Sequence, residues 1–111
     1  MTPRSLRGAR LVVVAALTVT ACAAPAGPRP APAIALVVAN VGLNYSQEMA
    51  AGFRAAVGAA DGVGVQVVGP EIVDGPREVE QFGELIDRHT DGISLFTLHP
   101  DLFVESLARA A

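Results

Sequence analysis

The fold class is decided by one stretch of sequence, IALVVANVGLNYSQEMAAGFRAAV, at residues 34–57. It opens with an unbroken apolar run, Ile34–Val38, which is typical of a strand buried on both faces of a parallel sheet. Asn44, with Gln47 three residues later, resembles a capping box that starts a helix. Apolar residues then recur on one helical face, at Met49, Phe53, Ala56, Val57 and Ala60. The stretch predicts a strand, a short loop and a helix.

The same alternation continues along the chain. Strand-like runs begin near Ile34, Val63 and Ile93, about thirty residues apart, as expected of βαβ units. The glycines of Gly62-Val63-Gly64 precede the second run and are interpreted as a turn that ends the first helix. The pattern predicts an α/β fold with a parallel sheet and right-handed crossovers.

Two further helices are predicted between and after these strands. Gly75-Pro76 predicts the start of the second, with proline at the first helical position. Its apolar stripe is Val79, Phe82 and Ile86, and Arg88 and His89 are expected in its last turn, where positive charge is favourable. The third helix is expected to start around Asp101.

The N-terminal segment has the pattern of a targeting sequence. Residues 1–10 carry three arginines and no acid, and a short apolar core follows at residues 11–19. This is the pattern of a signal peptide, and the core is about half of the roughly 20 residues that a permanent membrane span needs. The alternative is a buried strand or helix. We expect a signal peptide at residues 1–21.

Cys22 is the single cysteine of the chain, and Val19-Thr20-Ala21-Cys22 resembles the lipobox of bacterial lipoproteins. The resemblance implies cleavage before Cys22 and lipidation of its thiol, which would anchor the protein to a membrane. Ordinary cleavage near residues 21–23, leaving an unmodified secreted protein, is the alternative. Residues 22–32, with prolines at four positions, are predicted to form an extended linker of about 30 Å.

The composition of the remaining chain excludes several functions. Without residues 1–21, five arginines and no lysine face eleven acidic residues, a net charge of −6, so we expect no nucleic-acid partner. The loop after the first strand holds one glycine, Gly42, which does not fit a dinucleotide-binding motif. His89, His99 and Asp101 match no metal-site spacing. We expect no metal, no cofactor and no enzymatic activity.

Residues 33–111 resemble the sugar-type periplasmic binding proteins, the ribose- and galactose-like solute receptors of ABC importers. The first stretch is similar to their opening strand, loop and helix. EIVDGPREVEQFGELIDRHTDGISLFTLHPDLF, residues 71–103, is similar to their second loop, second helix and Val-Asp-Gly-Ile segment, with the closest matches at Thr90–Ile93 and Pro100-Asp101. The resemblance implies a type I fold with the flavodoxin-like strand order 2-1-3, present here as an incomplete N-terminal lobe.

In this family the loop after the first strand supplies an aromatic wall and an amide to the ligand cleft. Tyr45 falls on the first aromatic position, while Leu43, Asn44 and Ser46 depart from the family pattern, which puts an ordinary pentose or hexose in doubt. The alternative for Tyr45 is packing on the helical face of Met49, and for Asn44 a helix cap. The resemblance leaves as ligand-binding candidates Tyr45, Asn44, Asn40, Thr97 and His99, and for His99 a solvated turn residue is the alternative.

The resemblance implies a lipid-anchored solute receptor that delivers a sugar or sugar-like molecule to ABC permease subunits. It would lie at the cell envelope, on the outer face of the cytoplasmic membrane or in the periplasm. The alternative is a ligand-sensing lipoprotein that partners a membrane kinase or chemoreceptor. A transcription-factor effector domain fits poorly, because a signal peptide stands where a DNA-binding segment is expected.

Overall fold

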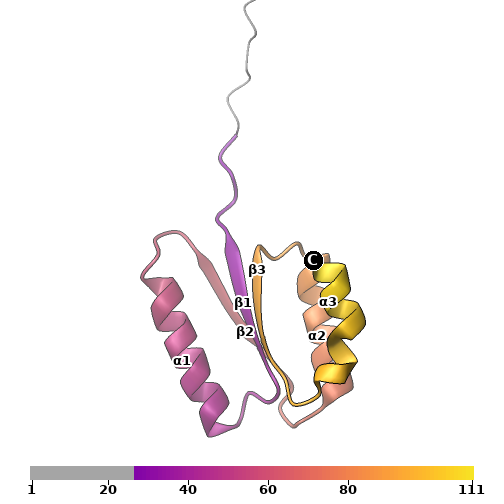
Figure 1. Ribbon diagram of the computed structural model, residues 1–111. Helices are drawn as coiled ribbons and strands as arrows, with labels where there is room; N and C mark the ends of the chain where they lie inside the picture. The colour runs from indigo at the N-terminus through magenta and orange to yellow at the C-terminus, as the bar shows by residue number, and fades with distance from the viewer. Residues whose placement is uncertain (1–26) are drawn as a thin grey trace, which may run out of the picture.

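The computed structural model describes residues 27–111, so the predicted signal peptide and Cys22 lie outside the described residues. A three-stranded parallel sheet lies between two layers of helix (Figure 1). Along the chain the elements are β1 (Ala33–Val38), α1 (Asn44–Gly58), β2 (Gly64–Val68), α2 (Gly75–Asp87), β3 (Gly92–Phe96), the 3-10 helix η1 (Pro100–Phe103) and α3 (Val104–Ala110). The predicted α/β alternation is confirmed. Residues 27–32 of the predicted linker are exposed and form neither helix nor strand.

The strand order is β2-β1-β3, and both strand pairs are parallel. This order is compatible with the flavodoxin-like arrangement. In the register, Leu36 lies opposite Val67 on one side and Ser94 on the other, so these side chains share a face. Helix α1 covers this face, and α2 and α3 cover the other (Figure 1). Strand β1 is thus paired at both edges and covered on both faces, which explains its apolar sequence.

The larger core lies between the sheet and α2. It comprises five buried residues, namely Ala35, Val37, Phe82, Leu85 and Phe103. The rings of Phe82 and Phe103 meet edge to face with centroids 5.6 Å apart. Phe82 comes from the predicted stripe of α2, whose other members, Val79 and Ile86, pack partly buried against this core. Burying one such ring stabilises the fold by about 1.5–3 kcal/mol.

The smaller core lies between the sheet and α1, and here the predicted helical face is only partly correct. Leu36, Val38 and Ala50 are buried, with Met49, Phe53 and Val67 packed against them. Ala56 and Ala60, which the periodicity placed on the buried face, are exposed, whereas Ser46 is buried. The physical reason is the way α1 is oriented on the sheet. Its small residues Ser46 and Ala50 face the strands, and its later alanines face solvent.

The helix ends also differ from the sequence prediction. Leu43 is the N-cap of α1 and makes no side-chain capping bond, and Asn44 is already helical, so the predicted capping box is absent. In α2 the N-cap is Asp74, whose carboxylate accepts a hydrogen bond from the backbone N–H of Arg77. Pro76 is the second helical residue rather than the first.

The end of α2 and the start of the last helix need two further corrections. Arg88 is the C-cap of α2 and His89 lies beyond it with a φ of 55°, so neither residue is in the last turn. A residue with positive φ cannot continue a right-handed helix, so α2 ends before His89. The segment from Pro100 to Phe103 is a 3-10 helix, and α-helix begins only at Val104, after the predicted start at Asp101. Gly62, with a φ of 76°, lies in the predicted turn after α1.

Candidate functional site

The candidate site is the carboxyl edge of the sheet, where the loops after the three strands come together at residues 39–43, 69–74 and 97–99. They lie side by side because all strands are parallel (Figure 1). The backbone N–H of Val41 donates to the carbonyl of Pro70 over 3.0 Å, which joins the first two loops. Ligands of open α/β sheets bind at this edge, outside the strand ends and at the point where the strand order reverses.

Asn40 shapes the first loop. Its side chain is only 8% exposed, and Oδ1 accepts a hydrogen bond of 2.6 Å from the backbone N–H of Gly42. A Cβ at position 42 would lie 3.2 Å from this oxygen, so glycine makes room for the turn. The structure therefore places Asn40 at the predicted edge, with its side-chain oxygen engaged within the loop. Contact between Asn40 and a ligand stays a prediction.

Tyr45 is the half-exposed aromatic residue of this edge. Its side chain is 40% exposed, and its ring meets that of Phe96 edge to face, with centroids 5.4 Å apart and planes at 70°. Phe96, the last residue of β3, thus supports the ring. The contact joins α1 to a strand that is not its neighbour in the sequence. This geometry holds the ring in place and leaves part of its surface accessible, so a ligand contact stays a prediction.

Asn44 and Ser46, on either side of Tyr45, point in different directions. Asn44 is exposed and lines a hollow of about 370 Å³ with Gln47, Glu48 and Ala51 of α1. Ser46 is 1% exposed, and its hydroxyl has no hydrogen-bond partner. Only Tyr45 of these three combines partial exposure with a contact to β3.

Thr97 and His99 follow β3 and are linked to each other. The backbone N–H of His99 donates to Thr97 Oγ1 over 3.0 Å, and the Thr97 hydroxyl donates to Glu78 Oε2 over 2.9 Å. Thr97 is half-buried and His99 is exposed. The structure therefore brings together two of the predicted residues directly, and connects both to a residue of α2.

Glu78 is the part of this site that the sequence prediction missed. It is 1% exposed, and its Oε1 has no hydrogen-bond partner. Burial raises the pKa of the Glu78 carboxyl, and the hydrogen bond from Thr97 and the charge of His99 offset part of the rise. A signal was present in the sequence, because Glu78 lies four residues before Phe82 and seven before Leu85, on the buried face of α2.

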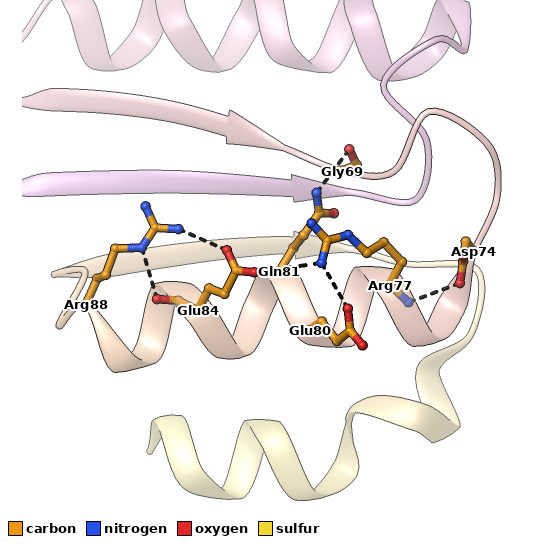
Figure 2. Close-up of polar contacts among 7 residues, drawn as sticks. All are labelled: Gly69, Asp74, Arg77, Glu80, Gln81, Glu84 and Arg88. Atoms are coloured by element: carbon orange, nitrogen blue, oxygen red, sulfur yellow. Dashed lines mark hydrogen bonds and ion pairs between the residues drawn. The ribbon is translucent and has the colours of Figure 1, made fainter.

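The second loop is held by α2. Gln81 Nε2 donates to the carbonyl of Gly69 over 3.5 Å (Figure 2). A Cβ on Gly69 would overlap the carbonyl of Val38, so the loop after β2 passes directly against β1 only because residue 69 is glycine. The ion pairs of Arg77 with Glu80 and of Arg88 with Glu84 lie on the exposed side of α2 (Figure 2).

The carboxyl edge also exposes apolar surface. Large apolar side chains from all three loops and from η1 are exposed there, namely Val41, Ile72, Val73, Leu98 and Leu102. Ile72 is 72% exposed, more than any other large apolar side chain of the described residues. Exposed apolar side chains beside a few polar ones are typical of a surface that binds a ligand or another protein.

Neither a metal site nor a membrane span is found in the described part of the chain. Residues 27–111 contain no group of three or more His, Cys, Asp or Glu side chains placed to hold a metal ion. No helix among them is long and apolar enough to cross a bilayer. Comparison of the chain with family models, with curated proteins and with solved structures gave no match.

Proposed function

We propose that this protein is the solute-binding lipoprotein of an ABC importer, and that it binds a sugar or sugar-like molecule in a cleft between two lobes. The carboxyl edge of residues 33–111 would form one wall of that cleft. The observation that carries the proposal is Tyr45, a half-exposed ring held edge to face on Phe96 at this edge. Binding rather than catalysis is proposed, because the edge offers an aromatic surface and hydrogen-bonding groups.

The chemistry of the edge suits a polyhydroxylated ligand. An aromatic ring covers the C–H face of a sugar, while hydroxyl, amide and imidazole groups hydrogen-bond its hydroxyls. Tyr45 would supply the ring, and Asn44 and His99, both exposed, would supply polar groups. Ser46 stands where the similar family has a second ring, and its side chain is buried, so one aromatic face remains. This favours a ligand other than the usual pentoses and hexoses.

The proposed location rests on the sequence. Lipidation at Cys22 would tether the domain, and the linker at residues 22–32 would hold it about 30 Å from the membrane surface. That distance suits delivery of a ligand to a membrane-embedded permease. A sensor that partners a membrane kinase or chemoreceptor would need the same tether and the same cleft.

Calorimetric titration of the full-length protein against a panel of sugars and nucleosides tests the proposal. We expect saturable binding of at least one member. Tyr45→Ala should weaken that binding about fivefold or more, because an aromatic contact that becomes buried on binding contributes more than about 1 kcal/mol.

Leu107→Ala is the matched control, since Leu107 is an exposed apolar residue in the middle of α3 and is not part of the three loops. It should bind as the wild type does. Absence of binding across the whole panel, or equal affinity for wild type and Tyr45→Ala, would contradict the proposal.

A further inference from the structure

Glu78 is a buried carboxyl group with half of its hydrogen-bonding capacity unused. It lies in the first turn of α2, among Phe82, Leu85 and the sheet. Oε2 accepts the Thr97 hydroxyl at 2.9 Å, and Oε1 has no partner. Carboxyl groups are rarely buried unless they are paired, and leaving an ionised oxygen unpartnered in the interior is costly.

The carboxyl group is connected to the backbone of the loop after β3. Because the Thr97 oxygen accepts the N–H of His99, the Thr97 hydroxyl proton is directed to Glu78. The three residues form a continuous set of hydrogen bonds, which we call the Glu78 network. It joins α2 to the loop that carries two candidate ligand residues.

The first turn of α2 is also shaped to receive this loop. A Cβ built on Gly75 would lie 2.7 Å from Leu102 Cδ1 and 2.9 Å from His99 Cδ2. Glycine at position 75 therefore lets the His99 ring and Leu102 rest directly on the helix. The loop is held at two points one turn apart, by contact at Gly75 and by hydrogen bonds at Glu78.

We infer that Glu78 is a positioning residue that seats Thr97 and His99 at the carboxyl edge through the hydrogen bonds of the Glu78 network. The consequence for the ligand site is that Glu78 holds the loop that presents His99, and that consequence alone rests on the proposed function.

The surroundings of the carboxyl group leave Thr97 as its hydrogen-bond partner. Burial raises the pKa of Glu78, so the protonated form is favoured relative to a solvated glutamate. His99 faces it from the β3 loop, and its charge favours the ionised form. From α2 itself, Asp74 and Arg77 are exposed and engaged in the N-cap and in the pair with Glu80. The sheet contributes apolar neighbours.

The raised pKa of Glu78 fixes how the stability of the whole fold depends on pH. The stabilisation from protonated Glu78 is fully present below the ordinary pKa of glutamate, and it is lost as the pH rises through the raised pKa.

Amide hydrogen exchange and chemical shifts of His99, measured by NMR on the full chain across the acidic to neutral range, test the inference. Protection of the His99 amide should fall about fivefold in Glu78→Leu, which cannot accept the Thr97 hydroxyl, since a hydrogen bond contributes about 1 kcal/mol. Glu78→Gln, which is nearly isosteric and keeps an oxygen that accepts a hydrogen bond, should retain protection.

Glu80→Gln is the matched control, because Glu80 is an exposed glutamate of the same helix. It should keep the wild-type profile. Equal protection of the His99 amide in wild type and Glu78→Leu would overturn the inference. Carbon NMR titration of the wild-type Glu78 carboxyl decides the matter even if the variant fails to fold: a His99 amide shift that does not change as this carboxyl titrates would also overturn it. These readouts contain no ligand, so failure of sugar binding contradicts the proposed function and leaves this inference standing.

Discussion

His89 ends α2 in a left-handed conformation, with a φ of 55°. The N–H of His89 donates to the carbonyl of Ile86, and that of Thr90 to the carbonyl of Leu85, which are the two hydrogen bonds of a Schellman motif. Glycine is the usual residue at this position, because a Cβ there meets the following carbonyl oxygen. The motif satisfies the last carbonyls of the helix and leaves strain at one residue.

His89→Gly should raise the free energy of unfolding by about 0.5–1 kcal/mol, because the relief of left-handed strain, about 1–2 kcal/mol, exceeds the entropy cost of glycine, about 0.5–1 kcal/mol. Urea unfolding of the full chain followed by circular dichroism measures it. Glu84→Gly, in the interior of the same helix, should instead lower stability by about 0.5–1 kcal/mol. A less stable His89→Gly protein would show that the conformation carries no strain.

At the scale of elements, α2 is the best-anchored helix of the described residues. Its start is capped by Asp74, its buried face supplies Phe82 and Leu85 to the larger core, and its first turn receives the β3 loop. Helix α1 has no side-chain cap and buries only Ser46 and Ala50. We therefore expect α2 to be more stable than α1. The loop after β3 is attached to α2.

Asp74→Ala should lower the free energy of unfolding by about 1 kcal/mol, because it removes the hydrogen bond to the N–H of Arg77 at the start of α2. The same denaturation experiment measures the change. Glu80→Ala is the control: it removes an exposed ion pair with Arg77, and its effect should stay below about 0.5 kcal/mol. Equal effects of the two variants would mean that the cap contributes nothing specific.

At the scale of the whole molecule, the three-stranded sheet leaves much apolar surface exposed. Val104 and Leu107 are exposed on α3, and Ile72, Leu98 and Leu102 are exposed at the carboxyl edge. Strands β2 and β3 each pair along one edge only within the described sheet. Exposed apolar surface of this extent is typical of a face that contacts another surface.

Cys22→Ser should move the protein from the membrane fraction to the soluble fraction, because the hydroxyl cannot take the lipid that the lipobox-like Val19-Thr20-Ala21-Cys22 predicts. Fractionation of cells and detection by antibody measure the shift. Thr20→Ser, which keeps a small residue and the cysteine, should leave the protein on the membrane. Unchanged fractionation of Cys22→Ser would contradict the lipid anchor and leave the fold unaffected.

The sequence by itself determined the order of the elements, because burial on both faces makes β1 continuously apolar and helical spacing marks α2 through Val79, Phe82 and Ile86. It also located the candidate site, since parallel strands bring their following loops to one edge. Asn40, Thr97 and His99 could be placed there from their positions alone.

Only the tertiary structure decided what surrounds each of these residues. The ring of Phe96 supports Tyr45, the Glu78 network ties Thr97 and His99 to α2, and Ser46 turns inward. These contacts join segments far apart in the chain, so no local periodicity encodes them. The physical reason is that the position of a helix on a sheet is set by packing of the whole core, and that position selects which side chains become buried.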